Sequence, residues 1–143
     1  MAGMGKIKLF LDTNVVIDFL LRREGFYDNS AIIFDLCLKG QVGISMSSLT
    51  IINCAYILRK AFDRLNIENN IEWLCKTFYV TAIDDRTIEE AIKLHTTDLE
   101  DAVQYVSSLQ YKPDIIITRD KTGFNDFSVP VMTPTEFVNK CKQ

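Results

Sequence analysis

Short apolar stretches alternate along this chain with longer segments in which apolar residues recur every three or four positions. The short stretches predict strands at residues 7–11, 42–46, 79–83, 114–118 and 129–132. The longer segments predict helices at residues 15–21, 30–38, 49–62, 68–77, 87–95, 99–109 and 135–140. Apolar strands that alternate with helices are typical of a mainly parallel sheet covered on both faces. We therefore expect a three-layer α/β/α sandwich with a central, mainly parallel sheet of four to five strands.

Residues at the ends of the expected helices support these boundaries. Thr133 followed by Pro134 and Glu136 has the spacing of a capping box, and Thr87 with Glu90 is a second candidate. Lys39-Gly40 is typical of a helix C-terminus. These signals support the places at which the pattern begins and ends the helices.

The expected helix at residues 49–62 is apolar on nearly every side, with Asn53 as the polar exception in its first half. Such a helix either lies centrally in the core or shares a face with a partner. We expect residues 51–58, or the helix at 15–21, to provide a surface for a small partner protein and for a homodimer.

The chain has 143 residues, which is enough for one domain with a substantial core. We expect a single domain over residues 1–143, with residues 1–5 as a disordered tail. No apolar run approaches the roughly 20 residues that a membrane helix needs. The four cysteines have no paired spacing, and three lie in apolar helical patterns, so we expect reduced thiols in a cytoplasmic protein.

The net charge of −3, from 16 basic and 19 acidic residues, argues against a protein that grips nucleic acid by bulk electrostatics. A nuclease remains compatible with this charge, because divalent cations bound by clustered acids reverse the local charge.

Acidic residues stand where the expected strands end. Asp12 follows the first strand, Asp120 follows the fourth, and Asp98 and Asp101 begin the helix at 99–109. Ligands of open α/β sheets bind outside the carboxyl ends of the strands. Carboxylate oxygens are the ligands that Mg²⁺ prefers, and one or two such ions can support phosphodiester hydrolysis. We therefore expect a Mg²⁺ or Mn²⁺ site here.

Each acid also has an ordinary structural interpretation. Asp98 is well placed as a helix N-cap, and for this residue the cap is the favoured interpretation. Asp12 has the position of a cap for the first helix, and Asp120 that of a turn residue. The joint placement at two strand ends and a helix start is what favours a metal site. Arg119 and Lys121, beside Asp120, are the basic residues best placed to contact a phosphate.

These residues resemble the PIN domain family, which includes the VapC-like ribonuclease toxins of toxin–antitoxin pairs. The stretch from Leu11 to Asp18 is similar to the opening motif, and Glu100-Asp101-Ala102 to the later acidic motif. The stretch from Ile117 to Asp120, with Phe124, is similar to the closing motif. The resemblance covers nearly the whole chain, and the opening and closing motifs together are fairly specific.

The resemblance implies an endoribonuclease that leaves a 3′-hydroxyl and a 5′-phosphate, and a toxin held by a small antitoxin protein that packs near the site. The implied catalytic residues are Asp12, Asp101, Asp120, Asn53 and Thr118. The implied ligands of Mg²⁺ or Mn²⁺ are Asp12, Asp101 and Asp120, with Asp98 assisting. Expected RNA contacts are Arg119, Lys121, Thr13 and Asn14.

Two positions depart from the family pattern. Asn53 stands where active members usually have Glu, and Gly123 where toxins often have Asp. Fewer negative ligands weaken metal affinity, unless Asp98 or Glu100 supplies the missing charge. A catalytically weak or inactive module that binds RNA or a protein partner is therefore the alternative. A phosphatase of the haloacid dehalogenase type is disfavoured, because Asn14 stands where those enzymes carry a second Asp.

Overall fold

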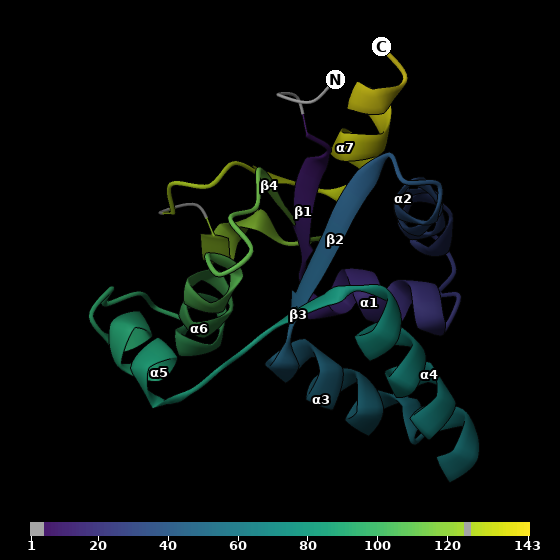
Figure 1. Cartoon of the computed structure of the whole chain (residues 1–143), viewed down its shortest axis with the longest axis horizontal. Helices are drawn as coiled ribbons and strands as arrows, with labels where there is room; N and C mark the ends of the chain where they lie inside the picture. The colour runs from purple at the N-terminus through teal and green to yellow at the C-terminus, as the bar shows by residue number, and fades with distance from the viewer. Residues whose placement is uncertain (1–4, 125–126) are drawn as a thin grey trace.

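A computed structural model describes residues 5–124 and 127–143 of the chain (Figure 1). The strands are β1 (Ile7–Leu11), β2 (Val42–Ser47), β3 (Tyr79–Thr81), β4 (Ile115–Ile117) and β5 (Val131–Met132). The helices are α1 (Thr13–Leu20), α2 (Tyr27–Leu38), α3 (Ser48–Leu58), α4 (Arg64–Thr77), α5 (Asp85–Ile92), α6 (Leu99–Ser108) and α7 (Pro134–Cys141), with a short 3-10 turn, η1 (Lys121–Phe124). Every expected strand and helix is present, and the expected tail at residues 1–5 lies, except for Gly5, outside the described residues.

The sheet is parallel throughout, in the order β3-β2-β1-β4-β5. Alternate residues of the central strand β1 enter two different cores: Leu9 and Leu11 pack on one face, and Phe10 packs on the other with Tyr105 of α6. Helices α1, α2, α3 and α4 lie on one side of the sheet in Figure 1, and α5 and α6 lie on the other. This is the three-layer α/β/α sandwich that the alternating pattern predicts.

Several element boundaries differ from the expected ones, and caps explain most of the differences. Helix α5 begins at Asp85 because Asp84 and Thr87 form the capping box, so the proposed box from Thr87 to Glu90 is wrong. Helix α4 begins at Arg64, capped by Asp63. The box at Thr133 and Glu136 is confirmed, and α2 ends before Gly40, whose φ of 79° favours glycine.

The cysteine prediction holds in part. All four thiols are free, and burial of Cys54 in the core raises its pKa to about 12. Cys75 and Cys141, in contrast, are exposed rather than packed as small hydrophobic residues. Across residues 5–124 and 127–143, none of the helices combines the length and apolar character needed to traverse a bilayer.

Candidate active site at the carboxyl ends of the strands

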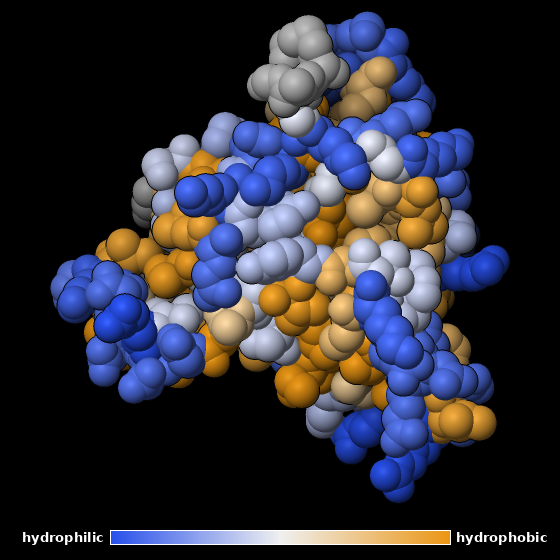
Figure 2. All heavy atoms as spheres, viewed as in Figure 1, coloured by the Kyte–Doolittle hydropathy of each residue, from blue (hydrophilic) through white to orange (hydrophobic). Residues whose placement is uncertain are grey.

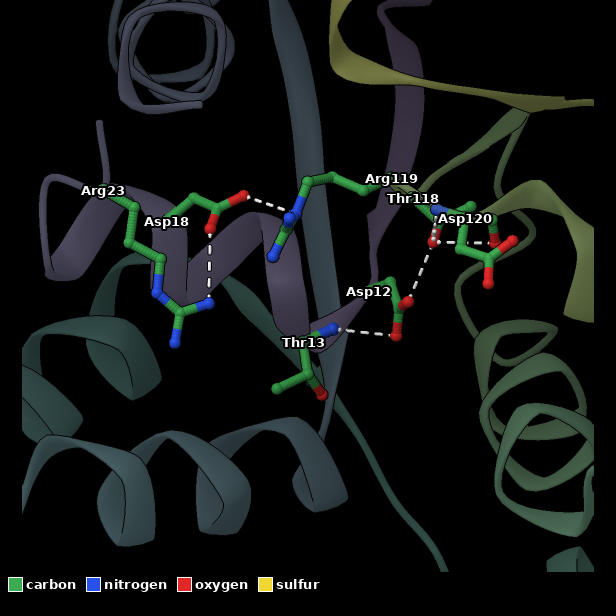
Figure 3. A network of polar contacts seen from close by, with 7 residues as sticks. All are labelled: Asp12, Thr13, Asp18, Arg23, Thr118, Arg119 and Asp120. Carbon is green, nitrogen blue, oxygen red and sulfur yellow. Dashed lines mark hydrogen bonds and ion pairs between the residues drawn. The ribbon is translucent and has the colours of Figure 1, made fainter. Parts of the chain in front are cut away.

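Asp12 lies at the junction of β1 and α1 and is held there by two contacts. Its carboxylate accepts a hydrogen bond from its neighbour's backbone, Thr13 N, at 2.8 Å, and one from Thr118 Oγ1 at 2.9 Å (Figure 3). Thr118 follows β4, the strand beside β1. The parallel pairing of these two strands is therefore what brings the opening and closing motifs together.

A pocket of about 360 Å³ opens beside Asp12. Residues from the first turns of α1 and α6, from α3 and from the end of β1 line it: Asp12, Thr13, Asn14, Asn53, Tyr56, Ile57, Glu100 and Asp101. Asn53 Nδ2 donates to Glu100 Oε1 across this pocket at 3.2 Å. The Asn53 amide thus lies in contact with a carboxylate supplied by α6.

Asp101 shares the electrostatic field of the surrounding acids. Partial burial, together with the negative charges of Asp98, Asp12, Glu100 and Asp120, raises its pKa to about 6. Burial also raises the pKa of Asp12, more than its hydrogen bond from Thr118 lowers it. No Lys or Arg among the described residues forms an ion pair with Asp12 or Asp101. Uncompensated, mutually repelling carboxylates are the donor set that a hard divalent cation requires.

Asp120 is held by its own turn. Its Oδ1 accepts from Thr122 N at 3.0 Å, and hydrogen bonds from Thr122 lower its pKa. Its backbone carbonyl is 3.3 Å from Thr118 Oγ1, which keeps this turn next to Asp12. Within the described part of the chain, no three carboxylate, histidine or thiol groups already stand in an arrangement that would hold a metal ion. The acids converge on one end of the sheet without closing around a single point.

Because Gly123 has no side chain, the Asp101 carboxylate can lie directly beside it. A Cβ at this position would lie 1.7 Å from Asp101 Oδ2, well inside van der Waals contact. A residue larger than glycine at position 123 would therefore displace the Asp101 carboxylate.

Asp98 has the structural role that the sequence favours for it. Its side chain accepts a hydrogen bond from Asp101 N at 3.2 Å and caps α6. This contact directs one carboxylate oxygen to the helix backbone. Its role as an assisting metal ligand stays a prediction.

Arg119 and Lys121 are not directed toward the acid pocket. Arg119 Nε lies 2.9 Å from Asp18 Oδ2 (Figure 3). The Arg119 guanidinium also lies over the ring of Phe26, 4.1 Å from the centroid. Asp18 is fully buried in α1 and also lies 3.5 Å from Arg23. It therefore pairs with two arginine side chains that could otherwise bind a ligand. Lys121 pairs with Glu136 at 3.0 Å. Their expected RNA contacts would require these ion pairs to open.

Sequence reasoning missed a buried polar network beneath the pocket. Gln104, only 1% exposed on α6, donates to Thr50 Oγ1 at 3.0 Å and accepts from Ser47 Oγ. Thr50 in turn shares a hydrogen bond of 2.9 Å with Thr13. The network joins α6 to the first turns of α1 and α3. The available signal was a glutamine inside the apolar face of the helix, since a buried amide requires partners.

The profile of the PIN domain family matches residues 8–122. The chain belongs to the PIN domain family. It is 25% identical over 142 residues to ribonuclease VapC1 of Aquifex aeolicus (strain VF5), covering 96% of this chain and 97% of the relative. The resemblance to the PIN domain family is thus confirmed, over a range that contains Asp12, Asp101 and Asp120.

Solved structures share the fold. A toxin–antitoxin complex from Klebsiella pneumoniae superposes with a TM-score of 0.66 at 19% identity, over 88% of this chain and 97% of that one. VapC20 of Mycobacterium tuberculosis, described as a sarcin–ricin loop cleaving toxin, superposes with a TM-score of 0.64 at 9% identity. The match covers 82% of this chain and 94% of that one. DNA-bound VapBC from Salmonella typhimurium superposes with a TM-score of 0.61 at 14% sequence identity, covering 90% of this chain and 98% of that one. At these identities the likeness concerns the PIN fold itself.

Proposed function

We propose that this PIN domain is a Mg²⁺- or Mn²⁺-dependent endoribonuclease and the toxin of a toxin–antitoxin pair. The observation that carries the proposal is the gathering of Asp12, Asp101 and Asp120 at one end of the sheet, where none of the three pairs with a Lys or Arg of residues 5–124 and 127–143. The ribonuclease named above, which aligns over almost its whole length, supports the reaction class. Toxin–antitoxin complexes among the structural neighbours support a protein antitoxin as the partner.

The donor set fits a divalent cation, which would be held by Asp12, Asp101 and Asp120. When bound, such an ion supplies a Lewis acid and an activated water for attack on phosphorus. Thr118 fixes the orientation of Asp12 through its hydroxyl, and Asn53 fixes that of Glu100. Glu100 is therefore the acid we assign to replace the charge that Asn53 lacks, with Asp98 holding the helix that carries it.

The test is cleavage of single-stranded and structured RNA by the purified chain with Mn²⁺, analysed for 3′-hydroxyl and 5′-phosphate ends. We expect Asp12→Asn to abolish cleavage. Asp35→Asn is the matched control, because Asp35 is an exposed acid paired with Lys39 on α2, outside the pocket. Cleavage that is undiminished in Asp12→Asn would identify a contaminant and defeat the proposal.

A catalytically silent binding module is the second candidate, and Asn53 is the observation that favours it. Calorimetric titration with Mn²⁺ separates the two, because a silent module shows no site in the micromolar-to-millimolar range. Heat of binding that disappears in Asp12→Asn supports the nuclease.

A further inference from the structure

Tyr56 is an aromatic residue that the fold leaves open to solvent at the edge of the acid pocket. It lies on α3, one turn after Asn53, and is 62% exposed. It lines the acid pocket together with Asp12 and Asn53. It also lines the adjoining groove of about 610 Å³ between α3 and α4, which contains Arg59 and Arg64. The ring therefore forms the ridge between the acids and a groove that carries arginines.

Arg59 is packed against this ring. Its guanidinium lies over Tyr56, 4.1 Å from the centroid, and its Nε donates to the Tyr56 carbonyl at 3.3 Å. Within residues 5–124 and 127–143, Arg59 forms no ion pair with an acid, whereas Arg64 pairs with Glu68 at 3.0 Å. The pair thus presents an aromatic ring and a positive charge that no acid among the described residues neutralises, beside a pocket lined by carboxylates.

We propose that Tyr56 and Arg59 form a nucleotide subsite, in which an unpaired RNA base stacks on the face of the Tyr56 ring that Arg59 does not cover and Arg59 contacts the adjoining phosphate. This rests on the proposed function, since a strand whose scissile phosphate lies at the acids passes the ring that lines the same pocket. Aromatic stacking and arginine contacts are how proteins hold single-stranded nucleic acid. Charge favours RNA over an acidic protein segment here, because a regular array of phosphates can engage both a bound cation and Arg59.

Stacking requires a base that is free of its partner strand, so the subsite selects single-stranded RNA. A base in a perfect duplex keeps its faces covered by its neighbours and cannot lie on the ring. The subsite therefore adds a preference for loops and single strands that the acids alone do not impose.

The test compares Tyr56→Leu, which removes the ring, with Tyr56→Phe, which retains it. Tyr79→Leu is the matched control: Tyr79 is 50% exposed, but it packs on Tyr111 and lies outside the acid pocket. Fluorescence anisotropy with a labelled single-stranded oligoribonucleotide gives Kd in the Asp12→Asn background, where the RNA stays intact. Photo-crosslinking of a 4-thiouridine oligonucleotide, followed by mass spectrometry of the peptides, locates the contact. Thermal unfolding checks that each variant is folded.

We expect Tyr56→Leu to raise Kd and KM about 5- to 100-fold, the range typical of one lost base stack. Tyr56→Phe and Tyr79→Leu should stay within about twofold of the parent, and the crosslink should map to the peptide that contains Tyr56. Arg59→Ala should weaken RNA binding. It should also reduce the slope of log affinity against log salt concentration by about one, the value for one lost phosphate contact. A perfect duplex should bind more weakly and be insensitive to Tyr56→Leu.

A Kd unchanged in Tyr56→Leu, or a crosslink elsewhere, overturns the subsite. So does a change in sedimentation without a change in RNA affinity, which would make Tyr56 part of a protein interface. Binding that depends on Tyr56 without any cleavage in Mn²⁺ would reject the nuclease and retain the subsite. Cleavage with an unchanged KM in Tyr56→Leu would support the nuclease and reject the subsite.

Discussion

At the scale of single residues, Asp98 and Asp101 show how two acids in one helix turn have different roles. The Asp98 carboxylate caps the backbone of α6, whereas the Asp101 carboxylate faces other acids and has a raised pKa. The carboxylate of Asp98 has a hydrogen-bond donor in the fold, whereas that of Asp101 is surrounded by other negative charges. An unsatisfied acid is the one that a cation would stabilise.

Substitution of Asp98 separates capping from metal binding. Asparagine caps a helix about as well as aspartate, so Asp98→Asn should unfold at the same temperature as the parent and keep its Mn²⁺ affinity within about twofold. Asp98→Ala should lower the free energy of unfolding by about 1 kcal/mol. Thermal unfolding and calorimetry measure both effects. A tenfold loss of Mn²⁺ affinity in Asp98→Asn would instead establish Asp98 as a ligand.

The raised pKa of Asp101 sets a pH dependence with opposite signs for the metal-free and metal-bound protein. Its pKa is about 6 in the fold against 3.8 as a free side chain, so the fold penalises the ionised form. The stability of the metal-free protein should therefore rise as pH falls from about 7 to 4. Mn²⁺ affinity should fall over the same range, because the ion binds the carboxylate. In Asp101→Asn, we expect higher metal-free stability at pH 8, a smaller gain on acidification and no stabilisation by Mn²⁺. Equal acid stabilisation in the parent and in Asp101→Asn would contradict this assignment.

At the scale of secondary-structure elements, the site depends on how α1, α3 and α6 are held together. Gln104 lies one turn after Asp101 and bonds to α3, where Asn53 lies one turn after Thr50. The buried amide therefore fixes the distance between the elements that carry Asp12, Asn53 and Asp101. Hydrogen bonds suit this role because they are directional, whereas apolar packing permits sliding.

Gln104→Met, which keeps the volume but removes the hydrogen bonds, should lower the free energy of unfolding by about 1–3 kcal/mol. It should also weaken Mn²⁺ binding, because the acids lose their fixed spacing. Gln110→Met is the matched control just beyond the C-terminus of the same helix: among the described residues, the Gln110 side chain bonds to the backbone of Ala82 alone, at 2.7 and 2.8 Å. That variant should lose stability without losing Mn²⁺ affinity. An equal effect of both variants on calorimetric Mn²⁺ affinity would leave Gln104 a stability residue alone.

At the scale of the whole molecule, apolar surface gathers over α3 (Figure 2). A groove of about 630 Å³ between α3, α5 and α6 includes Ile52, Ile88 and Leu99, which are 66%, 41% and 50% exposed. Of the two helices expected to provide a partner surface, α1 buries Val15, Val16 and Ile17 completely, which leaves α3. Exposed apolar area of this kind marks protein–protein contact sites.

We expect this surface to support the predicted homodimer. Ile52→Arg should convert the dimer to a monomer in light scattering coupled to size exclusion, because a charge in an apolar interface loses its solvation. Leu65→Arg on α4 is the control, since Leu65 is equally exposed, at 67%, but lies outside this groove. A parent that is monomeric at high concentration, or a dimer that survives Ile52→Arg, would refute the prediction.

The class of the fold follows from the amino-acid sequence, which also singles out Asp12, Asp101 and Asp120 as the candidate acids. Local periodicity specified every strand and helix, because burial on one or two faces imposes a period that is visible in the chain. Boundaries were less predictable: the pattern placed a cap at Thr87, whereas Asp84 is the residue whose side chain reaches the helix backbone.

Tertiary structure alone decided which side chains satisfy one another. Nothing local to Arg119 reveals that a buried Asp18 recruits it, and nothing local to Asn53 reveals its contact with Glu100. These partners are separated by many residues, and the order of parallel strands determines which of them meet. The acids are therefore readable in the chain, while the cations, hydroxyls and amides that orient them depend on packing.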